Sequence, residues 1–141
     1  MRFQGKAEPV GEAGDMLRAA TCAPGGAPTG TGGPGGPTGT PAAAPGGEAT
    51  FESEVTFAGE TDFLATGTVR FGDGHALRVS TVGLGHLAPG ADPGRRHGAV
   101  AWRVDGGEGR FAGATGLIAS AFSVAEDLAL TDHHFGVLLL P

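Results

Sequence analysis

The chain has 141 residues, a length typical of a single domain. Its 9 Lys and Arg against 15 Asp and Glu give a formal charge of −6, which argues against a nucleic-acid partner or an anionic membrane surface, because both need clustered cations. Cys22 is the only cysteine and excludes an internal disulfide, and residues 1–20 lack the apolar core of a secretion signal. The composition therefore predicts a cytoplasmic protein with no membrane partner.

The first 47 residues divide into two parts. Residues 1–10 alternate weakly between apolar and polar side chains and predict a first strand within an N-terminal segment 1–22, in which the residues around Met16 and Leu17 suit a short helical turn. Residues 23–47 consist only of Gly, Pro, Thr and Ala, with no charge and nothing large to bury. Because such a segment cannot offset the entropy of ordering, we predict a disordered Gly/Pro-rich insertion.

From residue 48 to residue 141 the dominant period is two, the signature of half-buried strands. Phe51, Val55 and Phe57, for example, alternate with glutamate and threonine. Strands are expected over residues 49–57, 62–71, 76–87, 97–104, 117–125 and 128–140. Because short turns join them and no helix has an apolar stripe, we predict an all-β fold, a small closed antiparallel β-barrel of about eight strands and calycin-like architecture.

The predicted last strand is apolar on both faces. Phe135, Val137 and Leu139 lie on one face, and Leu138 and Leu140 on the other. One face would fill the barrel, and the other needs cover from a partner subunit, the N-terminal segment or a neighbouring element. This pattern favours a homo-oligomer.

A glycine-rich turn separates the strands expected over residues 97–104 and 117–125. Five glycines surround one phenylalanine, Phe111, between residues 106 and 116. Glycine accepts a positive φ and a close backbone approach, so the segment suits a tight corner. Strands flank the turn and no helix follows it, which argues against a phosphate-binding or dinucleotide-binding loop. We predict a barrel corner with Phe111 as its plug.

The pattern Gly-Gly-x-Gly-x-Phe-x-Gly-x-x-Gly at 106–116 resembles one in the allene oxide cyclase and dirigent-like barrels, where a similar turn precedes a late strand. The run at 136–140 is similar to the apolar closing strand of such barrels. The resemblance implies an eight-stranded antiparallel barrel with an apolar cavity, often oligomeric. It also implies cyclisation or stereochemical steering of a reactive small molecule, as in bacterial cyclases of polyketide pathways. It carries over no catalytic residue.

Asp132, His133 and His134 form the densest polar cluster on the apolar last strand. Adjacent strand residues point to opposite faces, so the two histidines cannot both line one lumen without a bulge. If the face of Phe135 points inward, His133 is the candidate catalytic base. If the opposite face does, Asp132 and His134 form an acid–base pair. The alternative is that one imidazole is a hydrogen-bonded core group and the other lies at an interface.

Five further side chains are candidates for ligand binding. His86 and His97 flank the loop at 88–94 and could stand together at the barrel mouth, and Trp102 offers an apolar ring with one N–H donor. The ligand-binding set that we assign is His86, His97, Trp102, Phe63 and Phe135.

We predict no metal and no cofactor. The sequence contains no His-x-His pair and no phosphate loop of the Walker type. The alternative is a metal site in which Asp132 and His134 supply two ligands, with His86 or His97 as a third.

Three functions fit these observations. The first is a cyclase or isomerase that binds a hydrophobic, polyketide-like or lipid-like molecule in its lumen and folds it into a reactive conformer, an effect that can supply about 7–11 kcal/mol of barrier reduction. The second is a non-catalytic barrel that carries an apolar ligand. The third is an oligomeric structural module whose lumen is filled by side chains.

Overall fold

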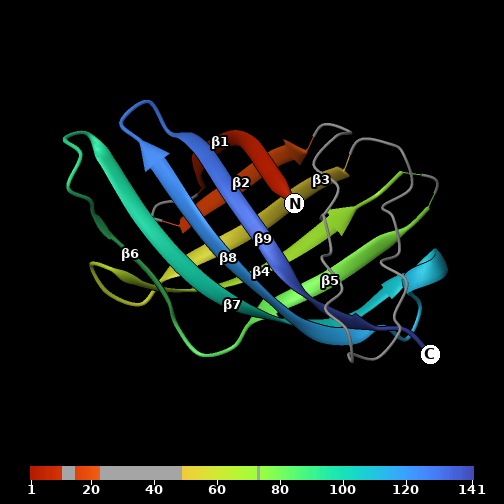
Figure 1. Ribbon diagram of the computed structural model, residues 1–141. Helices are drawn as coiled ribbons and strands as arrows, with labels where there is room; N and C mark the ends of the chain where they lie inside the picture. The colour runs from red at the N-terminus through yellow and green to blue at the C-terminus, as the bar shows by residue number, and fades with distance from the viewer. Residues whose placement is uncertain (11–14, 23–48, 73) are drawn as a thin grey trace, which may run out of the picture.

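β-strands dominate the structure (Figure 1). The computed structural model describes residues 1–10, 15–22, 49–72 and 74–141. The strands are β1 (Arg2–Val10), β2 (Asp15–Cys22), β3 (Ala49–Phe57), β4 (Asp62–Arg70), β5 (Ala76–Thr81), β6 (Gly85–Pro89), β7 (Arg95–Glu108), β8 (Thr115–Ala125) and β9 (Ala129–Leu139). A single turn of 3-10 helix, η1 (Gly109–Phe111), is the one helical element in these ranges. Nothing among the described residues forms a helix long and apolar enough to span a bilayer.

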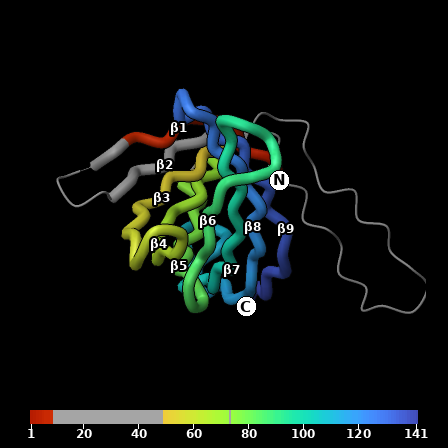
Figure 2. The backbone as a smooth tube through the Cα atoms, turned by 90° about the vertical axis from the view of Figure 1, so that its left-hand side faces the viewer, coloured from red at the N-terminus to blue at the C-terminus, as the bar shows by residue number. Residues whose placement is uncertain are grey.

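The strands of the described residues form one antiparallel sheet. Its order is β3-β2-β1-β9-β8-β7-β5-β4-β6, and β3 also pairs with β4 and β6 with β7. Two views at right angles show that the sheet twists and curls into a barrel-like shape (Figures 1 and 2). The prediction of an all-β antiparallel fold is confirmed.

The segment after the first strand differs from expectation. Residues 15–22 form strand β2, so the helical turn expected around Met16 and Leu17 is wrong. β2 pairs with β1 on one side and with β3 on the other. Pairing on both sides satisfies its backbone N–H and C=O groups, which outweighs a weak local helical preference. The predicted disordered insertion at 23–47 lies outside the described residues.

The strand expected over residues 76–87 is two strands, β5 and β6. Gly83 lies between them with a φ of 70°, a conformation that glycine adopts without a steric penalty. β5 pairs with β4 and β7, and β6 pairs with the same two strands nearer the start of β4. β7 is longer than expected, running from Arg95 to Glu108 rather than over 97–104.

Inward side chains come from alternate residues of each strand. In β3, for example, Phe51, Ser53 and Val55 are buried while the residues between them are not. The ring of Phe51 lies 5.7 Å from that of Phe3 on β1 and 5.6 Å from that of Trp102 on β7, measured between centroids. Burial of such a large apolar side chain contributes about 1.5–3 kcal/mol, so these contacts across the interior hold opposite walls together.

One end of the barrel-like sheet, which we call the far end, is closed by the glycine-rich turn between β7 and β8. Phe111 of η1 is buried there, and its ring lies 4.9 Å from that of Phe71. A Cβ atom on Gly107 would lie 2.3 Å from the carbonyl oxygen of Ala76, so this close approach of two backbones requires glycine. The predicted role of Phe111 as the plug of a corner is confirmed.

The opposite end, which we call the mouth, is bounded by the turn between β3 and β4, the loop between β6 and β7, and the turn between β8 and β9. Leu128 in the last of these turns has a φ of 63°, the left-handed region that a leucine rarely adopts. Its N–H donates to the carbonyl of Ala125, and its own carbonyl accepts from the N–H of Ala7 on β1, both at 2.9 Å. These bonds tie the turn to the neighbouring strands.

Candidate functional site

A hydroxyl, a carboxylate and an imidazole meet in the interior, on β8 and β9. The register pairs Ser120 with His134, and Phe122 with Asp132. Asp132 is fully buried and His134 is 7% exposed. The hydroxyl of Ser120 donates to Oδ1 of Asp132 at 2.5 Å. Burial of an ionisable carboxyl is unfavourable unless the carboxyl is hydrogen-bonded. The hydrogen bond from Ser120 therefore offsets part of the cost of burying Asp132.

The imidazole of His134 is enclosed by aromatic rings. Its Nε2 lies 3.2 Å from Oδ2 of Asp132, a distance typical of an ion pair, yet no described residue accepts or donates a well-directed hydrogen bond there. The imidazole centroid is 4.8 Å from the ring of Phe3 and 4.7 Å from that of Phe51. The arrangement places a carboxylate oxygen and an imidazole nitrogen close together in a largely apolar interior. It is not a nucleophile–base pair, because the Ser120 hydroxyl donates to the carboxylate rather than to the imidazole.

The structure decides which face of the last strand points inward. Asp132 and His134 lie inside, whereas His133 and Phe135 lie on the outer face, where Phe135 is 71% exposed. The assignments of His133 to a lumenal base and of Phe135 to a ligand-binding wall therefore do not hold. Strict alternation without a bulge at this point puts the two histidines on opposite faces.

Of the assigned ligand-binding residues, Trp102 and Phe63 lie inside. Both are almost completely buried. Nε1 of Trp102 has no hydrogen-bond partner among the described residues, and neither has the hydroxyl of Ser53. Trp102 packs in the middle of the interior, whereas Phe63 lines a pocket at the mouth.

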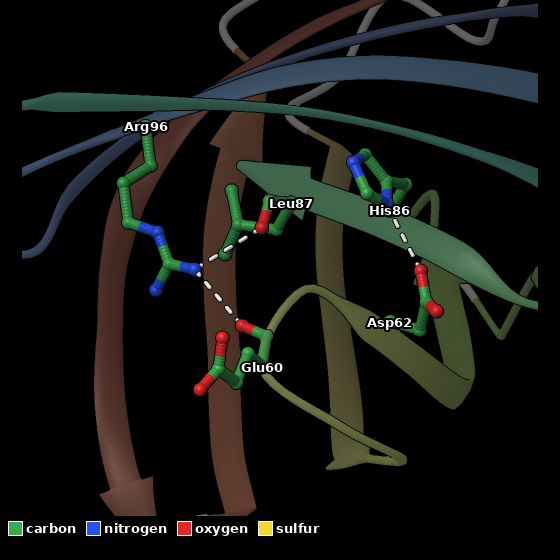
Figure 3. A network of polar contacts seen from close by, with 5 residues as sticks. All are labelled: Glu60, Asp62, His86, Leu87 and Arg96. Atoms are coloured by element: carbon green, nitrogen blue, oxygen red, sulfur yellow. Dashed lines mark hydrogen bonds and ion pairs between the residues drawn. The ribbon is translucent and has the colours of Figure 1, made fainter. Parts of the chain in front are cut away.

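His86 and His97 do not line the interior, because the alternation of β6 and β7 turns both side chains outward. Nδ1 of His86 lies 2.9 Å from Oδ1 of Asp62 on the outer face, in an exposed hydrogen bond (Figure 3). Neighbours on each strand, such as Leu87, take the inward positions. Within the described ranges, no three His, Cys, Asp or Glu side chains are grouped to hold a metal ion.

A pocket of about 420 Å³ opens at the mouth. Its walls are mostly apolar and come from six strands and the turns that join them. The lining residues are Ala7, Val55, Phe57, Phe63, Leu87, Pro89, Gly90, Asp92, Pro93, Gly94, Arg95, Arg96, Phe122, Val124, Ala125, Glu126 and Leu128. The buried Asp132 and His134 are not among them, although Phe122 is the cross-strand partner of Asp132.

Of the ligand-binding residues assigned from the sequence, only Phe63 lines this pocket. The signal that could have placed Arg96 is the alternation of β7, since Val100, Trp102 and Val104 point inward and residue 96 is in the same phase. One guanidinium nitrogen, Nη2, donates to the carbonyl oxygens of Leu87 at 3.1 Å and Glu60 at 3.3 Å (Figure 3). These contacts fix the side chain across the mouth.

The outer face of β8 and β9 carries an exposed apolar strip, which comprises Leu117, Phe135, Val137 and Leu139. Leu117 is the cross-strand partner of Val137, so these side chains adjoin. Exposed apolar area of this kind is typical of an interaction surface. The homo-oligomer expected from the sequence stays a prediction.

Comparison of the chain with models of known protein families, with curated proteins and with solved structures finds no match. The resemblance of the glycine-rich turn to allene oxide cyclase and dirigent-like barrels stays a prediction. The pocket and the buried polar groups are the features of the structure that bear on function.

Proposed function

We propose that the chain is a small closed β-barrel that binds an apolar small molecule in the pocket at its mouth. Closure is supported by strand pairing, since β3 pairs with β2 on one side and with β4 on the other. The two ends of the strand order thus meet, and β6 is a short addition beside β4 and β7. Closing a sheet in this way removes the exposed edges that otherwise invite aggregation.

The observation that carries the proposal is the pocket itself. Its volume of about 420 Å³ falls in the range of small-molecule sites, and the rings of Phe57, Phe63 and Phe122 supply apolar walls. A structural module with a filled interior has no need of such a space. The packing of Phe51 and Trp102 fills the middle of the interior, so the pocket at the mouth is where a ligand fits.

A second candidate, a cyclase or isomerase, is favoured by the position of the buried polar pair. Phe122 lines the pocket, and its cross-strand partner Asp132 lies on the same inward face, next to His134. A ligand that displaced the Phe122 ring would meet a carboxylate and an imidazole, the groups that general acid–base catalysis uses. We rank binding first because the pair lies outside the pocket lining.

Binding of the neutral fluorophore N-phenyl-1-naphthylamine tests the first proposal. We expect saturable binding with one site per chain, and strong weakening by Val124→Phe, which puts a larger side chain into the pocket. Leu64→Phe is the matched control, because Leu64 is exposed on β4 and its replacement should leave binding unchanged. Fluorescence of Trp102, the only tryptophan, reports that each variant is folded. Absence of saturable binding by the folded wild-type protein would refute the proposal.

The second candidate has its own test. Small molecules extracted from the purified protein are identified by mass spectrometry and incubated with fresh protein. An isomerase converts such a ligand, and Asp132→Asn should stop the conversion while the ligand still binds. Release of an unchanged ligand in every case would leave only the binding role.

A further inference from the structure

We propose that the ligand of the mouth pocket carries a single anionic group, such as a carboxylate, and that Arg96 binds it; this rests on the proposed binding function. The first observation is the direction of the side chain. Arg96 lies in the inward phase of β7, opposite Pro89 on β6 and Val124 on β8. Both partners line the pocket, and so does Arg96 itself. A cation thus stands at the entrance of an apolar space rather than on the outer face.

The second observation concerns the donors of the guanidinium. Nη2 is used by the carbonyl oxygens of Leu87 and Glu60, which leaves the other terminal nitrogen, Nη1, as a donor for a ligand. Figure 3 shows Nη2 directed toward these carbonyls and the other terminal nitrogen directed away from them. Because the carbonyls hold the side chain in place, little rotamer freedom is lost when an anion binds. A guanidinium held in one orientation presents this donor and its charge at a fixed place, which a flexible ammonium would not.

The third observation is charge. Among the described residues, no carboxylate forms an ion pair with Arg96. A partly buried cation without a counter-ion is unfavourable, so an anion in the pocket would be stabilised there. Arg95 also borders the pocket, but it lies in the outward phase of β7 and its Nη1 donates to the hydroxyl of Ser123 at 3.1 Å.

Two carboxylates limit the charge that the pocket accepts. Asp92 in the loop between β6 and β7 and Glu126 in the turn between β8 and β9 also line the mouth. They would repel a doubly charged group such as a phosphate monoester more strongly than a monoanion. The site therefore fits an apolar molecule that ends in one negative charge.

A matched pair of dyes separates this inference from the binding function. N-phenyl-1-naphthylamine is neutral, and 8-anilinonaphthalene-1-sulfonate is the same ring system with one sulfonate. We expect the wild-type protein to bind the sulfonate roughly 10- to 100-fold more tightly, the increment expected for a hydrogen bond to a charged group. Arg96→Gln should bring the affinities for the two dyes to nearly the same value, mainly by weakening the binding of the sulfonate dye. Arg96→Lys, which keeps the charge, should retain part of the preference.

Arg103→Gln is the control variant and should keep the full preference, because Arg103 is exposed on the outer face of β7 and does not line the pocket. Equal binding of the two dyes by the wild-type protein, or a preference that survives Arg96→Gln, would overturn the inference while the binding function stood. Failure of both dyes to bind would instead overturn the binding function. If Arg96→Gln does not fold, the wild-type comparison and Arg96→Lys still decide, because a preference unchanged in Arg96→Lys at both low and high salt would contradict a fixed guanidinium site.

Discussion

The two ends of the barrel-like sheet use the same residue type for different purposes. At the far end, the rings of Phe71 and Phe111 lie 4.9 Å apart and fill the space between the walls. At the mouth, the ring of Phe63 lies 5.9 Å from that of Phe122 and 6.2 Å from that of Phe57, and all three rings border an open pocket. The connecting segments explain the difference.

The turn at the far end folds a phenylalanine back into the interior, because its glycines permit a tight corner. The loop between β6 and β7 at the mouth contains only Gly, Ala, Asp and Pro over residues 90–94 and has no large apolar side chain to insert. An opening that no loop residue fills remains as the pocket. The pocket therefore has two causes: the strands supply its apolar walls, and the loop has no large side chain to fill it.

The largest expected effect comes from removing the plug at the far end. Phe111→Ala should lower the free energy of unfolding by about 3–5 kcal/mol, as is usual when a buried phenylalanine is truncated. Urea unfolding followed by Trp102 fluorescence measures the loss.

Phe57→Ala at the mouth is the matched comparison. Phe57 is only partly buried, so the loss should stay below about 2 kcal/mol, while the affinity for N-phenyl-1-naphthylamine should fall severalfold. Equal losses of stability in the two variants would mean that both ends are packed alike, contrary to the comparison.

Ser120→Ala tests how much the hydrogen bond to the buried Asp132 contributes to stability. The variant removes the hydroxyl that donates to Asp132 and should lower the free energy of unfolding by about 1–3 kcal/mol, because a buried acceptor loses a partner. The pocket does not include Ser120, so dye affinity should be unchanged. Chemical denaturation and dye titration on the same sample give both quantities, and a large change in affinity would place the polar pair in the binding site.

The smallest expected effect is on the outer face near the far end. Hydrogen bonds from Ser80 and from Arg103 lower the pKa of Asp105, and the charge of Arg103 acts in the same direction. A carboxyl whose folded pKa is lowered stabilises the folded state above its ordinary pKa of 3.8, and that contribution is lost as the pH falls through the lowered value.

Asp105→Asn should therefore destabilise the protein slightly near neutral pH and no longer do so in strong acid. Unfolding measured from pH 7 to pH 2 in both proteins gives the difference directly. Ligand affinity should not change, since the group lies on the outer face. A difference that grew as the pH fell would contradict the sign of the lowered pKa.

The sequence predicts the strands better than it predicts the site, for a physical reason. Period-two alternation placed Asp132 and His134 on one face of the last strand and His133 on the other, but it could not say which face is inward. That choice depends on register with β8 and β1, which brings Phe122 and Phe3 opposite Asp132. The pocket was not predicted because its walls come from six strands that are far apart in the sequence.

Local signals also fail where distant partners decide the structure. Met16 and Leu17 sit next to each other and gave no clear alternation, and pairing of β2 with two neighbours makes them part of a strand. Gly83 indicates a turn inside the strand expected over 76–87. The β-branched and apolar residues on either side of it favour a continuous strand, so the turn was not predicted. Arg96 has the same alternation phase as the inward residues of β7, but the strand was expected to begin at residue 97. Arg96 was therefore assigned to the preceding loop.

The turn that contains Leu128 has a consequence for how a ligand would bind. A leucine in the left-handed region is strained by about 1–2 kcal/mol, and it persists here because backbone bonds to Ala125 and Ala7 hold the turn on both sides. Leu128 also forms part of the pocket edge, so that edge is shaped before any ligand arrives. A preorganised rim spares an incoming molecule the entropy of ordering a loop and favours binding to a single ready-made conformation over induced fit.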